Sequence, residues 1–151
     1  MPIEAYGNNV GVIVARGPVV SCVVGLPIAQ PQPQTPTPNI PTPDLHPANG
    51  LLDTGASNCC INPSLAKSLN LPIAGYRPST DASGNTTQCI VRNGCFGLIL
   101  RNSVVRFFPA VQFIELPKDL PNHTLIIGRN MMVTFRSMYF SFRTGEYMIH
   151  F

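Results

Sequence analysis

One short run constrains this chain more than any other: an apolar pair followed by an aspartate on a glycine turn. Residues 51–55 read Leu-Leu-Asp-Thr-Gly, which predicts an apolar strand that ends in a carboxylate on a tight turn. A second run, Leu-Ile-Ile-Gly-Arg-Asn, follows roughly seventy-five residues later, at 125–130. Hydrophobic residues before this glycine predict a strand-to-helix junction. Asp-Thr-Gly alone is a weak signal, but the two runs in this order are far more specific.

Together the two runs resemble the signatures of retropepsin-like aspartic proteases, the family of retroviral and retroviral-type cellular proteases. The resemblance covers roughly residues 19 to 151. A proline-rich insertion, the run Leu-Asn-Leu-Pro at 69–72 and the terminal hairpin resemble the bacterial members more than the viral ones. The resemblance implies an all-β acid-protease fold with a flap hairpin and two short helices, forming one half of a two-fold dimer.

Hydrolysis of a peptide bond by carboxylates requires two of them, one to deprotonate water and one to polarise the scissile carbonyl. Two like charges that lie close together cannot both ionise readily, so such a pair holds one proton. Of the seven acidic residues, only Asp53 lies in an Asp-Thr-Gly setting. The chain therefore requires a homodimer, with Asp53 and its symmetry mate on the two-fold axis. We expect an aspartic endopeptidase that needs no metal or cofactor.

The resemblance also assigns roles around Asp53. Thr54 would interlock with the same region of the partner subunit, and Gly55 lets the substrate backbone approach closely. An extended peptide or protein substrate would be held by main-chain hydrogen bonds, with alternate side chains in pockets. The flap would be a hairpin of residues 76–81 and 86–91 that excludes water. The expected substrate-binding residues are Leu51, Cys60 and Ile126 (pockets), Ser57 and Asn58 (backbone), the small Ala56, and the flap tip Ser83 and Gly84.

One position departs from the retroviral pattern. Retroviral enzymes often carry an acid where Ser57 stands, and that acid pairs with the arginine that corresponds to Arg129. A serine cannot form this ion pair, so the sequence leaves the partner of Arg129 open.

The remaining pattern predicts a single, mostly β domain over residues 1–151. Residues 27–47 contain eight of the sixteen prolines and predict a loop insertion that cannot form a sheet ladder. Helices are expected at 62–69, where Asn62 is a capping-type residue, and at 129–134. The expected strands are 10–14, 18–26, 58–61, 76–81, 86–91, 95–100, 104–114, 125–127, 138–142 and 146–151. The last two form a closing hairpin, which we expect to build the dimer interface.

Composition excludes several other classes of protein. The net charge is +3 with no basic run, which disfavours nucleic-acid binding. No segment reaches the length of apolar sequence that a membrane span needs, and the N-terminus does not resemble a signal peptide. Five cysteines without a Cys-x-x-Cys pair disfavour disulfides and a zinc site, and favour a cytoplasmic location. Charged residues are only 11% of the chain, which suggests that a partner subunit covers some surface.

Two alternatives remain open. The first is a catalytically silent dimeric module of the same fold that binds peptides or proteins, with the proline-rich loop as a docking segment. The second is a serine or cysteine hydrolase that uses Ser57 or Cys60. It ranks last, because the chain has no Gly-x-Ser-x-Gly run and no histidine with an obvious orienting partner.

Overall fold

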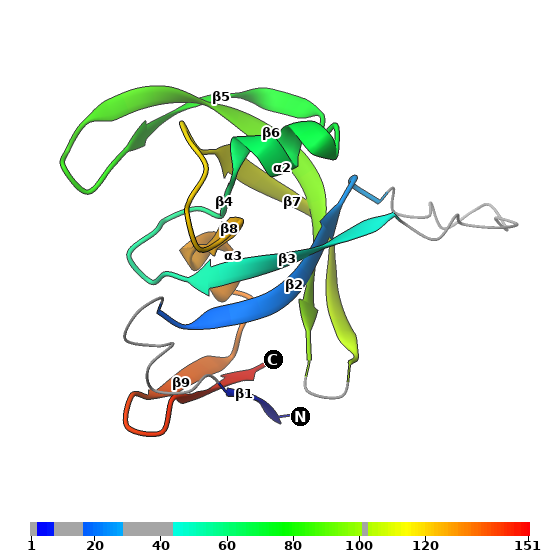
Figure 1. Ribbon diagram of the computed structural model, residues 1–151, viewed down its shortest axis with the longest axis vertical. Helices are drawn as coiled ribbons and strands as arrows, with labels where there is room; N and C mark the ends of the chain where they lie inside the picture. Colours follow the sequence, from blue (N-terminus) through cyan, green and yellow to red (C-terminus); the bar gives the residue numbers. More distant parts are fainter. Residues whose placement is uncertain (1–2, 8–16, 29–43, 101–102) are drawn as a thin grey trace, which may run out of the picture.

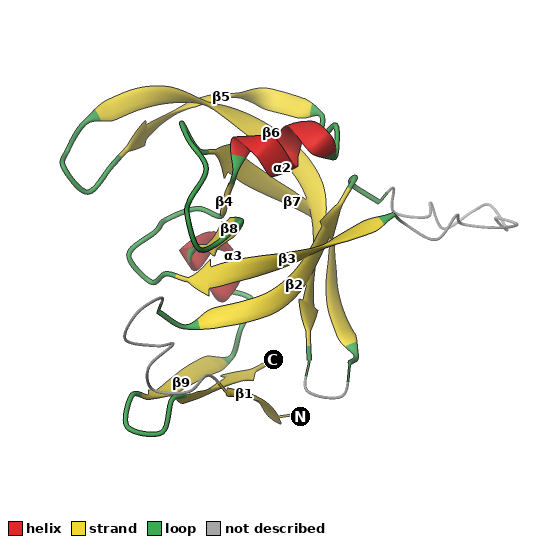
Figure 2. Cartoon of the chain, viewed as in Figure 1, coloured by secondary structure: helices red, strands yellow, loops and turns green. Residues whose placement is uncertain are grey.

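The computed structural model describes residues 3–7, 17–28, 44–100 and 103–151, and it shows two β-sheets with two short helices (Figures 1 and 2). The helices are α2, Pro63–Ser68, and α3, Arg129–Met132. The strands are β1 Ile3–Gly7, β2 Val19–Gly25, β3 Leu45–Leu52, β4 Cys60–Ile61, β5 Ile73–Thr80, β6 Thr86–Ile99, β7 Val105–Glu115, β8 Leu125–Ile127, β9 Ser137–Ser141 and β10 Glu146–His150. The predicted all-β class is confirmed.

The larger sheet closes on itself. Its strand order is β2-β3-β8-β4-β7-β6-β5, and β2 also pairs with β6. This extra pairing joins six of the strands into a barrel and leaves β5 outside it. The hairpin of β5 and β6 therefore extends beyond the barrel and arches over one end of the molecule (Figure 1).

A separate sheet of three strands, in the order β1-β10-β9, lies at the end of the molecule opposite the hairpin (Figure 1). The predicted closing hairpin is β9 and β10, and it is confirmed. The strand β1 was not predicted. Tyr147 of β10 is buried, and its hydroxyl donates a hydrogen bond of 2.8 Å to the Val19 carbonyl. This contact ties the small sheet to the barrel.

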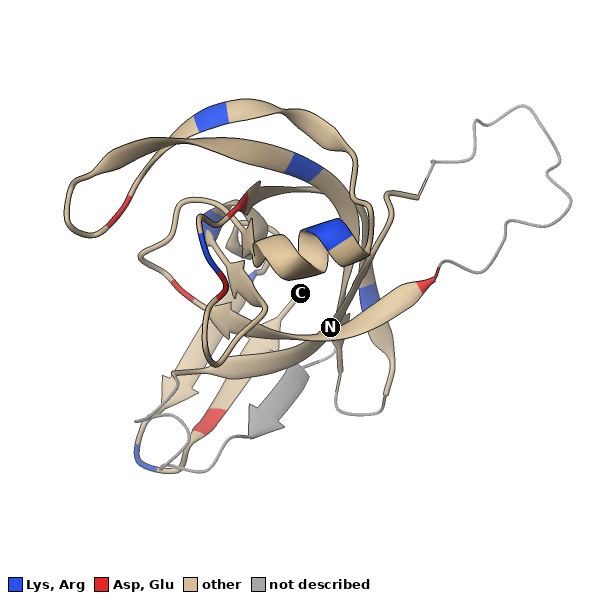
Figure 3. Ribbon diagram, turned by 45° about the horizontal axis from the view of Figure 1, so that its top comes forward, with Lys and Arg blue, Asp and Glu red and all other residues tan. Residues whose placement is uncertain are grey.

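Apolar residues at alternate positions of the strands form the core. On β2, for example, Val20, Cys22 and Val24 are fully buried. This is the period of two that a strand with one buried face requires. Helix side chains such as Leu65 and Met131, and Ile149 of the small sheet, join the same cluster. The charged residues are scattered over the fold rather than gathered on one element (Figure 3).

The long strand β6 corrects one prediction. The sequence suggested two strands, at 86–91 and 95–100, but β6 is continuous with an irregularity between Gly94 and Phe96. A Cβ at Gly94 would lie 3.0 Å from the Gly25 carbonyl oxygen and 3.2 Å from Phe113. The glycine permits this close approach, and here β6 changes its partner from β5 to β2.

The proline-rich insertion is also shorter than predicted. Its last residues, Leu45 to Pro47, pair with Val23 to Gly25 as the start of β3. Proline is tolerated here because β8 joins β3 only from Gly50 onward, so β3 has a single neighbour at Pro47. Residues 29–43 of the insertion, the strand predicted at 10–14 and part of the turn at 101–103 lie outside the described residues.

Both helices are shorter than the predicted 62–69 and 129–134, and Asn62 does not cap α2 as expected. Its side chain instead donates to the His123 carbonyl at 2.9 Å and accepts from the Leu120 amide at 3.0 Å. The amide of Ser64 at the start of the helix is bonded to Asp119 at 3.1 Å. A residue far along the chain thus replaces the local cap. None of the described helices is long and apolar enough to cross a membrane.

Candidate active site

The two sequence motifs lie side by side in the barrel. Strand β3 runs parallel to β8, with Leu51 opposite Ile126 and Leu52 opposite Ile127. The ladder continues one residue further, because the Asp53 amide donates to the Ile127 carbonyl at 3.1 Å. Asp53 therefore lies just beyond the ends of two paired strands, where its turn begins.

The turn itself is held by Asp53. The Gly55 amide donates to Asp53 Oδ1 at 2.8 Å, and the Ala56 amide donates to the Asp53 carbonyl at 3.2 Å. A Cβ on Gly55 would lie 3.1 Å from the same carboxylate oxygen, so glycine keeps the carboxylate close to its own turn. Asp53 is half-buried, and Thr54 and Gly55 are exposed.

The second motif braces the loop that follows Asp53. The amides of Arg129 and Asn130 donate to the carbonyls of Ala56 and Ser57 at 2.9 and 3.1 Å. In the reverse direction, Asn130 Oδ1 accepts from the Cys59 amide at 2.9 Å. The sequence indicated the motif but assigned no role to Asn130. Its bracing role becomes visible only when the two segments lie together.

Beside this loop is a cleft of about 830 Å³. The hairpin of β5 and β6 supplies one wall, and β4, β8 and the end of β7 supply another. Seven of the predicted site residues line the cleft: Asp53, Gly55, Ala56, Ser57, Asn58, Cys60 and Ile126. The residues that sequence reasoning missed are Pro78, Ser79, Thr80, Asp81, Ala82, Thr87, Cys89, Ile114, Leu116 and Pro117. The alternation of the hairpin strands was the signal that could have found Ser79, Thr87 and Cys89.

The other four predicted site residues do not line this cleft in the single chain. Thr54 is exposed on the turn, and Leu51 lies against Gly17, where a Cβ would be 2.8 Å from Leu51 Cδ1. Ser83 and Gly84 form the hairpin tip, which is stabilised by Asp81: its Oδ1 accepts from the Ser83 amide at 2.8 Å. Asp81 and Ala82, rather than Ser83 and Gly84, face the cleft.

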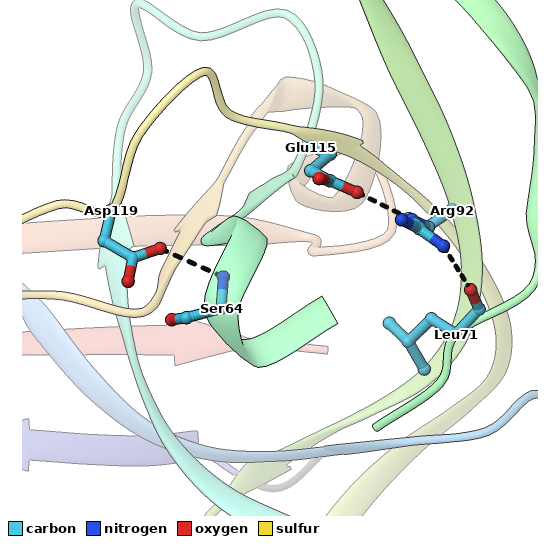
Figure 4. A network of polar contacts seen from close by, with 5 residues as sticks. All are labelled: Ser64, Leu71, Arg92, Glu115 and Asp119. Atoms are coloured by element: carbon cyan, nitrogen blue, oxygen red, sulfur yellow. Dashed lines mark hydrogen bonds and ion pairs between the residues drawn. The ribbon is translucent and has the colours of Figure 1, made fainter. Parts of the chain in front are cut away.

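A largely buried ion pair supports the cleft wall (Figure 4). Arg92 of β6 contacts Glu115 of β7 at 2.7 Å and also donates to the Leu71 carbonyl at 2.8 Å. The two charged side chains are only 12% and 8% exposed. Glu115 lies between Ile114 and Leu116, two residues of the cleft, so the ion pair holds this wall against the root of the hairpin.

Figure 4 also shows Asp119, a loop residue whose carboxylate accepts a hydrogen bond from the amide of Ser64 in the first turn of α2. Hydrogen bonds from Ser64 lower the pKa of the Asp119 carboxyl, with a smaller contribution from the charge of Lys67. The loop that contains Asp119 is thereby fixed to the helix, and the same loop begins with Leu116 and Pro117 of the cleft.

Cys60 lines the cleft, but its thiol is not activated as a nucleophile. Burial raises the pKa of Cys60 to about 12, and the nearby Cys59, Cys89 and Asp53 add to the effect. A thiol with so high a pKa is protonated at neutral pH and does not attack. This opposes a cysteine hydrolase. Among the described residues, no group of three or more His, Cys, Asp or Glu side chains could hold a metal ion.

Comparison with known proteins agrees with this geometry. The sequence profile of the aspartyl protease family matches residues 44–131, which include both motifs. The chain belongs to the aspartyl protease family. The expected retropepsin-like fold is confirmed by similarity to a solved structure.

The fold of this aspartyl protease family member is also found in a solved structure, that of a retropepsin-like aspartic protease from Rickettsia conorii. The TM-score is 0.57 at 9% sequence identity, and the similarity covers 98% of this chain and 90% of the other. At this identity the likeness establishes the fold alone. No curated protein matches the chain.

Proposed function

We propose that the protein is an aspartic endopeptidase that acts as a homodimer and hydrolyses internal peptide bonds. The observation that carries the proposal is the position of Asp53, at the end of β3 and on the wall of a cleft beneath the β5–β6 hairpin. The membership of the aspartyl protease family supports the same reaction.

A homodimer follows from the chemistry of the site. One chain contributes one carboxylate, and among the described side chains that line the cleft the other acid is Asp81. Asp81 is bonded to the amides of Ser83 and Asn85, at the tip of the hairpin. A second Asp53 on a two-fold axis would complete the pair with identical geometry.

In the dimer, the ionised carboxylate accepts a proton from a water molecule, whose oxygen attacks the carbon of the scissile carbonyl. The other, protonated carboxyl donates its hydrogen bond to the carbonyl oxygen. A proton then passes to the amide nitrogen, and the carbon–nitrogen bond breaks to give a carboxyl group and an amine. The pair needs one shared proton, which favours activity at acidic to mildly acidic pH.

The lining of the cleft indicates the substrate class. Ile114, Leu116, Pro117 and Ile126 offer apolar surface close to Asp53. We expect an extended peptide with hydrophobic side chains beside the scissile bond, because apolar surface gains free energy when it is covered. A cleavage profile with charged residues beside the scissile bond would reject this expectation.

A reducing compartment such as the cytoplasm is part of the proposal. All five cysteines lie in the described residues and are free thiols. Four of them are buried, where they pack as small hydrophobic side chains.

The test is cleavage of a peptide library by the wild type and by Asp53→Asn across pH 4 to 7, with the molecular mass measured by light scattering. We expect a dimeric wild type that cleaves and a dimeric variant that does not. A dimer that binds peptides without cleaving them at any pH would replace the proposal with the catalytically silent binding module. Cleavage that survives Asp53→Asn would exclude the aspartic mechanism.

A further inference from the structure

Arg77 lies in the middle of β5, on the hairpin that forms one wall of the cleft. Its cross-strand partner is Cys89, and the next pair on the same face is Ser79 with Thr87. Cys89, Ser79 and Thr87 all line the cleft. Because residues at alternate positions of a strand share a face, Arg77 shares a face of the hairpin with these three. Arg77 itself lies beside the lining of the cleft rather than in it, and Pro78 and Thr80 of the opposite face also line the cleft.

The guanidinium of Arg77 reaches the loop that follows Asp53. Its Nη1 donates a hydrogen bond of 3.3 Å to Asn58 Oδ1. Asn58 lines the cleft, so this contact joins the hairpin wall to the floor beside the catalytic turn. The acceptor is a neutral amide, which leaves the positive charge of Arg77 without compensation from Asn58.

The charge of Arg77 is not neutralised elsewhere in the described part of the chain. The ion pair found there joins Arg92 to Glu115, so no described carboxylate lies within 4.0 Å of Arg77. Both strands of the hairpin carry a basic segment in Figure 3. The two arginines differ: Arg92 is largely buried and paired with a carboxylate, whereas Arg77 is exposed and its partner among the described residues is the neutral Asn58.

We infer that Arg77, held by Asn58, forms a subsite that binds an acidic side chain of the peptide substrate. Its fork of N–H donors matches the two oxygens of a carboxylate, and one hydrogen bond to Asn58 leaves donors available. Arg77 bonds to Asn58 rather than to Asp53, so we place the acidic residue outside the hydrophobic pair at the scissile bond. The inference rests on the proposed function, because it requires a peptide in this cleft.

Two-fold symmetry makes the inference specific. A dimer carries two copies of Arg77, one on each side of the paired Asp53 residues. The preference for an acidic residue should therefore occur at two positions, placed symmetrically about the scissile bond. An exposed ion pair contributes little, so we expect glutamate to improve affinity over glutamine by about threefold at each position. Two glutamates together should give roughly tenfold.

The experiment uses peptides with two central leucines in an alanine background. Glutamate, glutamine or lysine replaces each outer alanine in turn. Affinity is measured by fluorescence anisotropy with the full-length Asp53→Asn protein, and kcat/KM is measured with the protein that retains Asp53. Each is repeated with Arg77→Gln, Arg77→Glu and the control Lys67→Gln, whose exposed lysine lies on α2 and does not line the cleft.

We expect Arg77→Gln to abolish the preference for glutamate over glutamine and Arg77→Glu to turn it into a preference for lysine. Lys67→Gln should leave the preference for glutamate intact. The preference should fall in 0.5 M salt, since screening weakens exposed pairs. The inference is overturned if Arg77→Gln weakens the binding of the glutamate and glutamine peptides equally. The role of Arg77 would then be to hold the hairpin against Asn58. Cleavage without a glutamate preference overturns the subsite alone. A glutamate preference in binding, with no cleavage by the wild type, overturns the proposed protease and retains the subsite.

Discussion

Gly128 lies against the backbone of Asn58 so closely that a Cβ at position 128 would be 2.4 Å from the Asn58 carbonyl oxygen. The glycine of the second motif is therefore a packing requirement of the first. It lets the start of α3 approach the loop after Asp53, where the amides of Arg129 and Asn130 bond to that loop. The two motifs form one unit that fixes the position of the carboxylate.

Gly128→Ala should destabilise the protein by about 1–3 kcal/mol, the usual range for an overpacked core, because the added methyl meets backbone atoms that cannot rotate away. Urea unfolding followed by circular dichroism measures this. Gly75→Ala is the matched control. Its φ of 153° carries a backbone penalty, but no atom lies within 4 Å of the new Cβ. Equal losses in the two variants would show that the contact with Asn58 is unimportant.

Asn130→Ala should lower both stability and activity. The substitution removes the oxygen that accepts the hydrogen bond from the Cys59 amide. A hydrogen bond of this kind contributes about 1 kcal/mol to the stability of the protein. The loop between Asp53 and Cys59 would then be held less firmly, so kcat should fall more than the stability loss alone explains. Asn122→Ala, at an exposed position on the loop before β8, is the control for the loss of an asparagine. Unchanged kcat in Asn130→Ala would exclude the bracing role.

The small sheet should carry the dimer contact. Tyr139 and Phe142 are 57% and 68% exposed, and both belong to the region around β9. Tyr139→Lys combined with Phe142→Lys should produce a folded, inactive monomer, visible by light scattering and circular dichroism. Leu26→Lys, also at an exposed position but next to β2 of the barrel, should remain a dimer. Dimers that survive the double substitution would move the interface elsewhere.

Deletion of residues 139–151 is a less informative test of the same interface. It would remove Tyr147 and Ile149, which are 1% and 0% exposed and belong to the core. The deletion would therefore unfold the chain whether or not the hairpin makes the dimer. Point substitutions at exposed positions avoid this ambiguity.

Stability should decrease at alkaline pH because of the buried thiols. Burial raises the pKa of Cys22 from 9.0 to about 12. The folded state then keeps its proton at a pH where the unfolded state has lost it. This contribution is fully present below pH 9 and is lost as the pH rises through about 12, by at most about 1.4 kcal/mol per pH unit. Urea unfolding at pH 8, 9 and 10 should show a shallower decline in Cys22→Val than in the wild type. Parallel declines would contradict the assignment to Cys22.

Much of the site could be predicted from local sequence. An apolar strand, an aspartate and a glycine turn are encoded within residues 51–55, and the β-hairpin tip at 81–85 is encoded by its own turn residues. The strands of the barrel follow from alternation, because one face of each is buried. These features depend on backbone stereochemistry and on burial over a few residues, which any short segment expresses.

Other features were decided by contacts between distant segments. Asn62 was expected to cap its helix, but its side chain meets the loop at His123, and Asp119 bonds the first turn instead. Pro47 joins a strand because β3 has one neighbour there, and β1 exists because β10 offers it an edge. The contact between Arg77 and Asn58 likewise depends on how the hairpin folds over the loop. Local sequence sets which conformations a segment prefers. Only the packed chain determines which polar groups must be paired with one another, because an unpaired buried group is far more costly than a lost local preference.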